Sequence, residues 1–398
     1  MRPNPIQELL GRPLRLGVIG GGPESFIGYA HRGAAEFDGR MRVVAGVFSS
    51  DPLRSRTRGV GFGLDAARCY GDHEEMLAAE AARADGIEAL AVMTPNDTHY
   101  PICVAAVARG LDIVCDKPLA NSLAEALDLV ARVRRAGTVF CVTHTYAGYT
   151  MVREARALVA AGAIGDVTLV QAEYLQAGMA VRHEDGPLTS KLKWKLDARR
   201  SGPSLVLGDI GTHAFHLAEF VAGIRVAELS AEVGTLLPGR SVHDYATAAL
   251  RFESGAKGSL LVSQAAAGAE NNAMIRVFGT KGHVEWQHRD ANYLTLALQG
   301  EAPRRLGRGD AYLHPAALRC LRQPRGHPEG FREALATLYA DAAEAIVARR
   351  LAKSADPLAL DFPGIEDGVR GLGFIEAALA SNAAGARWTR CHVDLPLS

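Results

Sequence analysis

The sequence lacks a surplus of charge of either sign and lacks any long apolar run. Its 398 residues carry 44 lysines and arginines against 44 aspartates and glutamates, so the formal net charge is +0. A neutral chain produces no long-range field that would attract nucleic acid or an anionic membrane. No stretch of about eighteen residues is both apolar and uncharged, and no apolar leader precedes the first glycine cluster. We therefore expect no nucleic-acid partner, no membrane partner and no secretion.

Cysteine is also scarce. The chain has 6 cysteines, scattered without CxxC spacing, so the pattern predicts neither a zinc site nor a disulfide framework. We expect no metal site and a reduced cytoplasmic setting. A small, mostly neutral ligand fits this composition best.

The length exceeds what one hydrophobic core usually supports, which predicts two domains. From Leu14 to Tyr146, short apolar runs rich in β-branched residues alternate with helical stretches. This alternation predicts a doubly wound parallel sheet of the Rossmann type. We assign residues 1–146 to this dinucleotide-binding domain and residues 147–398 to a second domain, with a C-terminal helix that could pack back on the first.

The second half has a different pattern. Several strands follow one another without helices between them, as in ATAALRF, ESGAK and GSLLVSQ, or MIRVFG, TKG and HVEWQ. Turn residues between alternating strands are typical of hairpins. The predicted fold is therefore α/β, with a Rossmann domain followed by an α/β domain built on a large, mainly antiparallel sheet.

A glycine-rich segment, GVIGGGPESFIGYAH, follows the first predicted strand and opens the first helix. Backbone N–H groups and the helix dipole at such a turn hold a dinucleotide pyrophosphate. We expect Gly20, Gly22, Phe26 and Ile27 to contact the cofactor. The spacing departs from G-x-G-x-x-G because five residues separate Gly22 from Gly28, and a glycine turn without a ligand is the alternative.

The second strand ends in VFSSDPLRSR, where an NAD-specific site normally carries an acidic residue. Ser49 and Ser50 occupy that place, and Arg54 lies close by in the sequence. Two hydroxyls and a cation could accept a 2′-phosphate, which favours NADP over NAD. The alternative is that Asp51 and Pro52 simply begin a helix.

Two further segments end parallel strands, where open α/β sheets bind their ligands. They are MTPNDTHY and VCDKPLA. A turn, a helix-face histidine and a surface lysine are the plain alternatives, although a lysine between an apolar strand and a proline would be desolvated and able to stabilise an alkoxide. The residues expected to bind cofactor here are Thr94, Pro95, Asn96, His99, Asp116, Lys117 and Pro118.

A third segment, GDIGTHAFH, places Asp209 and His213 four residues apart on one predicted helix face. Oxidation of a secondary alcohol needs a base for the hydroxyl proton, and histidine suits that task near neutral pH. A hydrogen-bonded structural histidine is the alternative for His213. His216 is more readily explained as a core residue.

Taken together, GVIGGG, TPNDTH, DKP, Trp194-Lys195 and GDIGTHAFH resemble the Gfo/Idh/MocA family of sugar and inositol dehydrogenases, from Leu14 to about Ala384. The resemblance implies a Rossmann domain and an α/β domain whose open antiparallel sheet forms the interface of a homodimer or homotetramer. It also implies that NAD(P) exchanges a hydride with a secondary alcohol carbon of a sugar or inositol.

The resemblance also implies roles for single residues. Lys117 matches the lysine of the family's EKP motif, with Asp116 in place of glutamate, and would hold the reacting oxygen. His213 would accept the proton and Asp209 would anchor a substrate hydroxyl. The family's Asn-Tyr/Arg pair reads Thr145-Tyr146 here, which leaves the identity of the substrate open. The expected substrate contacts are Tyr146, Trp194, Lys195 and His327.

Three alternatives remain open at this point. His327 lies in GHPEGF, where Pro328 and Glu329 could merely start a helix. The enzyme could retain its cofactor and catalyse a redox-neutral epimerisation, elimination or glycoside cleavage. A non-catalytic dinucleotide sensor would have lost acid and base residues, whereas Lys117, Asp209 and His213 are all present.

Overall fold

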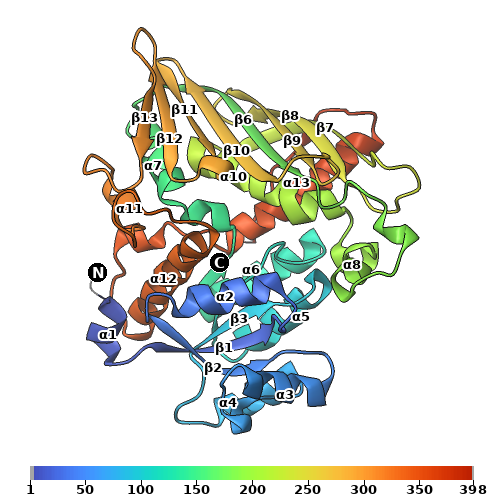
Figure 1. The fold of residues 1–398 in the computed structure, drawn as a ribbon, viewed down its shortest axis with the longest axis vertical. Coiled ribbons are helices and arrows are strands. Elements are labelled where there is room, and N and C mark those ends of the chain that lie inside the picture. Colours follow the sequence, from blue (N-terminus) through green and yellow to red (C-terminus); the bar gives the residue numbers. More distant parts are fainter. Residues whose placement is uncertain (1–3, 397–398) are drawn as a thin grey trace.

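The computed structural model describes residues 4–396, except for the side chains at 190 and 191. The first half forms a five-stranded parallel sheet in the order β2-β1-β3-β4-β5, with helices on both faces (Figure 1). The predicted Rossmann sheet is thus confirmed. Its strands are β1 Leu14–Gly20, β2 Met41–Val47, β3 Ala89–Met93, β4 Asp112–Cys115 and β5 Phe140–Val142. Its helices are α2 Phe26–Glu36, α3 Pro52–Gly61, α4 His73–Ala81, α5 His99–Val107 and α6 Leu123–Ala136.

Local sequence sets the ends of these elements. Helix α6 begins where the Ser122 side chain accepts a hydrogen bond from the Glu125 amide, and it ends at Gly137, whose φ is 62°. Capping side chains satisfy amide groups that the first helical turn leaves free, and a left-handed glycine closes the last turn. Strand β1 has β2 on one side and β3 on the other. The order in which strands are added to the sheet therefore reverses at β1. The loops after β1, β3 and β4 meet at one edge, where such sheets bind ligands.

The second half forms a nine-stranded sheet within the described residues, in the order β13-β12-β11-β10-β6-β9-β8-β7-β14. Strands β6 and β9 pair in parallel, and the other pairs described for this sheet are antiparallel. The prediction of a mainly antiparallel sheet is confirmed. The strands are β6 Val167–Gln176, β7 Val226–Gly234, β8 Tyr245–Phe252, β9 Lys257–Ser263, β10 Asn271–Gly279, β11 Gly282–Gln287, β12 Tyr293–Leu298, β13 Arg304–Gly307 and β14 Thr389–Arg390.

One face of this sheet packs on helices α7 (Thr150–Ala160), α10 (Thr212–Ala222) and α13 (Ile365–Ala383) (Figure 1). Strand β6 shows the alternation that results. Its Val170, Ala172 and Tyr174 side chains are buried toward the helices, whereas Leu169 on the opposite face is 37% exposed. Residues two apart on a strand share a face, so the outer face of the sheet stays open.

Helix α12 (Phe331–Arg350) returns from the second half to the parallel sheet and lies beside α2 (Figure 1). Leu335, Leu338 and Ile346 of α12 belong to the same buried core as Leu14 and Leu16 of β1. The core of the first sheet is therefore completed by residues from near the end of the chain. The remaining helices are α1 Pro5–Leu10, α8 Ser190–Lys195, α9 Ala198–Ser201 and α11 Pro315–Leu318.

The structure shows where the cysteines lie and whether any helix could span a membrane. All six cysteines lie within residues 4–396 as buried free thiols. Among the helices of this range, none combines the length and the apolar character that crossing a membrane requires.

Candidate active site

The glycine turn after β1 is too crowded for side chains. Gly20 and Gly21 have φ values of 96° and 66°. A Cβ atom on Gly20 would lie 2.5 Å from the Met93 carbonyl oxygen, and one on Gly28 would lie 2.2 Å from the Gly21 Cα atom. Helix α2 therefore packs directly on the turn through Gly28. Gly21 and Gly28 were not among the predicted cofactor residues, although the run of three glycines was a signal for the first of them.

The start of α2 follows this turn at once. The Ser25 side chain accepts a hydrogen bond from the Gly28 amide at 3.1 Å, and Phe26 beside it is 65% exposed while Ile27 is half-buried. A Cβ atom on Gly22 would lie 2.9 Å from the Phe48 carbonyl oxygen. A side-chain-free turn against a helix N-terminus is the arrangement that lets backbone N–H groups approach a pyrophosphate.

The residues after β2 include two serines and the start of α3. The Ser49 Oγ atom accepts a hydrogen bond from the Asp51 amide at 3.1 Å, and the Asp51 carboxylate caps α3 by accepting one from the Arg54 amide at 2.7 Å. Ser50 and the Arg54 side chain are exposed. Arg58, which the sequence did not single out, lies against Gly22 and donates to the Phe48 carbonyl at 3.4 Å. The helix-start explanation thus accounts for Asp51, and Arg58 lies between the glycine turn and the end of β2.

His99 fastens the loops after β3 and β4 to each other. Its ring nitrogens lie 2.8 Å from the Pro118 carbonyl oxygen and 2.9 Å from the Thr94 carbonyl oxygen. The ring is buried and both nitrogens are occupied, so His99 shapes these loops rather than offering a free atom to a ligand. Pro95 lies half-buried in the first loop. The Asn96 side-chain Nδ2 group donates to the Ser201 carbonyl at 3.0 Å and connects this loop to the second half.

The loop after β4 carries Lys117. The Asp116 carboxylate accepts hydrogen bonds from the Lys117 amide at 2.9 Å and from the Thr143 hydroxyl at 3.0 Å. Asp116 therefore fixes the turn from which Lys117 extends. The Lys117 ammonium donates to the Asp209 backbone carbonyl at 2.5 Å and lies 3.3 Å from the Asp209 Oδ1 atom.

Asp209 is the centre of a charged cluster drawn from distant segments. Its Oδ2 atom lies 2.5 Å from the Lys195 Nζ atom, at the end of α8, and 2.6 Å from the Gln264 Nε2 atom, just after β9. The sequence pattern predicts an α-helix through this region, but Leu207–Gly211 (η5) forms a π-helical turn before α10 begins. Such turns are frequent at functional sites because they reorient one side chain within a helix.

The Asp209 carboxylate is held in its charged form. Burial alone would raise its pKa, but the charges of Lys195 and Lys117, with hydrogen bonds from Lys195 and Gln264, hold the pKa well below its ordinary value. The cluster therefore contains two ammonium groups and one carboxylate. A net positive charge at this position stabilises negative charge that develops on a bound oxygen.

His213 lies on the next turn and is kept neutral. Burial, with the charge of Lys117 and the neighbouring His144, lowers its pKa well below the ordinary histidine value, although Asp209 acts in the opposite direction. Its ring packs edge-to-face against Tyr146 at 5.0 Å and His144 at 5.6 Å. Among the residues that the structure describes, none forms a hydrogen bond with its Nδ1 atom. A neutral imidazole keeps one ring nitrogen unprotonated, and that nitrogen can accept a proton.

A layer of rings lies behind His213. His144, at the end of β5, stacks on His216 with ring centroids 4.4 Å apart. The Tyr146 hydroxyl lies 2.5 Å from the Tyr174 hydroxyl, and Tyr146 is buried. Tyr146 therefore supports the His213 ring from within. No sequence pattern pointed to His144, because a lone histidine after a strand belongs to no recognised spacing.

The two remaining predicted substrate contacts differ in their position. Trp194 is half-buried beside Lys195, whose ammonium lies 5.9 Å from the centre of its ring. Lys195 thus reaches the Asp209 cluster from the second half of the chain. His327 is exposed, and across residues 4–396 no hydrogen bond or ion pair joins its side chain to Lys117, Asp209 or His213.

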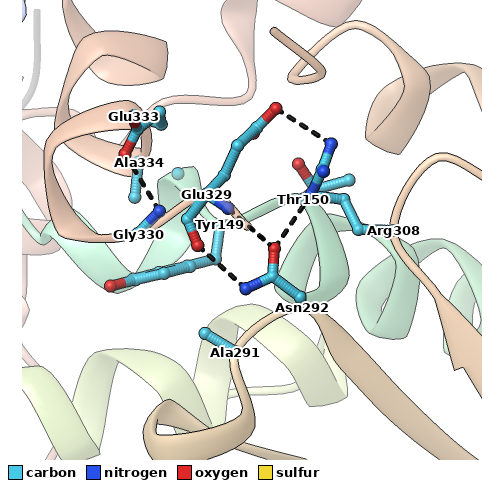
Figure 2. A pocket seen from close by; sticks show the side chains of 10 residues that line it. Tyr149, Thr150, Ala291, Asn292, Arg308, Glu329, Gly330, Glu333 and Ala334 are labelled. Carbon is cyan, nitrogen blue, oxygen red and sulfur yellow. Dashed lines mark hydrogen bonds and ion pairs between the residues drawn. The ribbon is translucent and has the colours of Figure 1, made fainter. Parts of the chain in front are cut away.

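The loop that carries His327 instead supports the start of α12. Arg308 pairs with Glu329 at 2.9 Å, and the Glu329 amide and carbonyl both bond to Asn292. Figure 2 shows Arg308 bonded directly to Glu329, with Asn292 bonded to both residues, and the Gly330 amide bonded to the Glu333 side chain. Capping of α12 accounts for this segment.

The described part of the chain contains no group of three or more histidine, cysteine, aspartate or glutamate side chains that could hold a metal ion.

Comparison with protein families gives two matches along the chain. Residues 14–144 match the family described as "Oxidoreductase family, NAD-binding Rossmann fold", and residues 152–285 match the "GFO/IDH/MocA C-terminal domain". Both matches follow the order of the two halves described above.

Individual relatives align over nearly the whole length. The "Uncharacterized oxidoreductase YfiI" of Bacillus subtilis is 34% identical over 96% of this chain and 98% of its own length. A crystal structure of an "inositol dehydrogenase homolog complexed with NAD+ from Azotobacter vinelandii" superposes with a TM-score of 0.90 at 37% identity, covering 95% of this chain and 97% of the other. A second structure, from the same source, contains NADH and myo-inositol, with a TM-score of 0.87 at 36% identity over 95% and 98% of the two chains.

Proposed function

The chain belongs to the Gfo/Idh/MocA family of oxidoreductases. We propose that it oxidises a secondary alcohol carbon of a cyclitol or sugar and reduces NAD(P)+ to NAD(P)H. Membership rests on the two family matches and on relatives that align over almost the entire chain. The protein is accordingly an NAD-binding oxidoreductase. What the proposal adds is the substrate class and the roles of individual residues.

The residues around the first sheet fit a dinucleotide. The turn at Gly20, Gly21 and Gly22 leaves no room for a Cβ atom, which suits the close approach of a pyrophosphate to the backbone at the start of α2. The loops at Thr94 and Lys117 end neighbouring strands at the same edge. When bound there, the nicotinamide supplies the site that accepts or donates the hydride.

The charged cluster carries the proposal. An ammonium has three N–H groups, and Lys117 directs two of them toward Asp209, which leaves one for the reacting oxygen of the substrate. Its positive charge stabilises the alkoxide character that the oxygen gains as its proton leaves. The neutral ring of His213 accepts that proton. Asp209, held as an anion by Lys117 and Lys195, accepts a hydrogen bond from a second hydroxyl group and so orients the ring.

A polyol ring fits these groups better than an apolar alcohol. Lys117, Lys195 and Asp209 would lose hydration without gain if the substrate offered no hydroxyl groups in return. The structural relative that contains myo-inositol supports a cyclitol as the first substrate to test. The preference for NADP stays a prediction, supported by the exposed Arg54 and by the absence of an acidic residue at positions 49 and 50.

Two broader parts of the proposal concern the state of the protein. The open outer face of the nine-stranded sheet supports a homodimer or homotetramer, which light scattering of the purified protein would measure. A cytoplasmic location rests on the buried free cysteines and the balanced charge.

The test is reduction of NAD+ and NADP+, followed by nicotinamide absorbance, against a panel of inositols, aldoses and glycosides. We expect one cyclitol or sugar to give a clear signal that His213→Ala abolishes. Silence across the panel, with cofactor demonstrably bound, would overturn the dehydrogenase proposal. A cofactor retained through purification, with substrate consumed but no net reduction, would favour a redox-neutral reaction instead.

A further inference from the structure

Gln264 is a buried side chain that reaches the charged cluster from the second sheet. It follows β9, and its backbone amide donates to the Asp244 carbonyl at 2.9 Å while its carbonyl accepts from the Met179 amide at 2.8 Å. Its side chain is 3% exposed. Because the backbone is bound on both sides, the side chain has a fixed origin. Its Nε2 atom lies 2.6 Å from the Asp209 Oδ2 atom and 3.4 Å from the Gln176 Oε1 atom.

The orientation of this amide follows from its neighbours. If the group were turned over, the Gln264 Oε1 atom would face the Asp209 carboxylate, and two acceptors would repel each other at hydrogen-bond distance. The Nε2 group must therefore face Asp209. The Oε1 atom is buried, and no donor from residues 4–396 satisfies it. The gain of the bond to a charged acceptor outweighs this loss.

The two oxygens of Asp209 have different surroundings as a result. Oδ2 receives Lys195 at 2.5 Å and Gln264 at 2.6 Å, so it is occupied by two close donors. Oδ1 receives Lys117 at 3.3 Å, and Lys117 makes its shorter bond to the backbone carbonyl. A rotation of the carboxylate would break both bonds at Oδ2. Oδ1 thus keeps an acceptor position that the described residues leave open.

We propose that Gln264 is a positioning residue that, together with Lys195, locks the Asp209 carboxylate so that its Oδ1 atom receives a substrate hydroxyl. The proposal rests on the function proposed above, in which Asp209 orients the substrate. It assigns the second sheet a direct part in the site, because Gln264 is attached to β9 and hydrogen-bonds to Gln176 of β6.

The experiment compares Gln264→Glu and Gln264→Leu with the wild type across a pH range, with Gln299→Glu as a matched control. Gln299 is exposed after β12, so its replacement adds the same charge away from the site. Kinetics with the substrate identified for the wild-type enzyme give kcat and KM separately. A wild-type enzyme without turnover would count against the proposed function, whereas normal wild-type turnover leaves this test of Gln264 independent.

Gln264→Glu supplies the distinctive result. The carboxyl group that it introduces would face Asp209. The other titratable groups around Asp209 are Lys195, Lys117, Tyr174 and His213. Two carboxylates in contact share one proton. When the introduced group is protonated, it donates to Asp209 in place of the amide. When it is ionised, it repels Asp209. We expect kcat/KM relative to wild type to approach one near about pH 6 and to fall on the order of 10-fold or more by about pH 9.

Gln264→Leu lacks any donor, so we expect its kcat/KM to be lower by roughly 10- to 100-fold at every pH. The Gln299→Glu ratio should stay near one throughout. A Gln264→Glu ratio that does not change with pH, whatever its height, would overturn the positioning role, because a purely structural residue would not respond to the protonation of its replacement.

Discussion

The Lys117 ammonium lies 3.3 Å from the Asp209 Oδ1 atom, although the two residues are 92 positions apart in the chain. Lys117 extends from the end of a strand in the parallel sheet, and Asp209 belongs to the π-helical turn that leads into α10 of the other half. The site therefore exists only where the two halves meet. Without the second half, Lys117 would lose its counter-charge, whereas Asp209 would keep Lys195.

Removal of the Lys117 ammonium should abolish most of the activity. We expect Lys117→Ala to lower kcat by roughly 10²- to 10³-fold, since a preorganised charge at the reacting oxygen acts mainly in the transition state. Affinity for the reduced cofactor, measured by nicotinamide fluorescence, should stay within a few-fold of wild type. Lys257→Ala, at an exposed position on β9, is the control. Wild-type kcat in Lys117→Ala would remove Lys117 from the reaction.

The lowered pKa of His213 predicts the shape of the pH profile. Because burial keeps the ring neutral, the base stays in its active form below the ordinary histidine pKa of about 6.5. We expect kcat/KM for the oxidation to hold through that pH and to decline only at a pH well below it. His213→Ala should lose about 10²- to 10⁴-fold in kcat.

The exposed His392 provides the comparison for this experiment. His392→Ala should retain both the rate and the pH profile of the wild type. An acidic limb centred at the ordinary histidine pKa would contradict the burial of the His213 ring as the cause of its neutrality.

Much of the fold could be predicted from periodicity. Alternating strands and helices indicated the parallel sheet, and consecutive strands with glycine turns indicated the antiparallel one. The order of strands in the second sheet could not be predicted, because β6 lies between β10 and β9, which follow it in the chain by many residues. Such pairings depend on long-range packing, which a local sequence pattern does not record.

Site residues could be predicted where reactive side chains occur at a recognisable spacing in the sequence. Lys117, Asp209 and His213 stood at strand and helix ends with recognisable neighbours, and the structure brings Lys117 and Asp209 into contact. Gln264 and His144 belong to no such spacing. Their relation to the site depends on the pairing of β9 with β8 and on the position of β5, neither of which a local sequence records.

Cofactor choice can be tested at the end of β2. Ser49→Asp introduces a carboxylate beside the expected 2′-phosphate, and we expect it to weaken NADPH binding by about 5- to 20-fold through charge repulsion, with NADH affected less. Fluorescence titration of both cofactors measures the ratio. Ser254→Asp, in an exposed turn of the second half, should change neither affinity. An unchanged NADPH/NADH ratio in Ser49→Asp would refute the preference for NADP.

Stability should decline in mild acid. Burial lowers the pKa values of a group of histidines, to about 3 for His216. The others are His31, His144, His213, His243 and His288. The unfolded chain takes up protons at these residues below its ordinary histidine pKa, whereas the folded chain does not. The free energy of unfolding is therefore fully retained above about pH 6.5 and lost as the pH falls below it.

Replacement of His216 isolates one contribution to this loss. For a single buried histidine the slope is at most about 1.4 kcal/mol per pH unit, so the unfolding free energy of His216→Gln should fall less steeply than that of wild type between about pH 6.5 and about pH 5. Urea denaturation at several pH values gives both slopes. His392→Gln should keep the wild-type slope, because that residue is exposed in the folded protein. Equal slopes in His216→Gln and wild type would mean that the His216 ring takes up its proton in the folded state, which its stacking against His144 and Phe220 opposes.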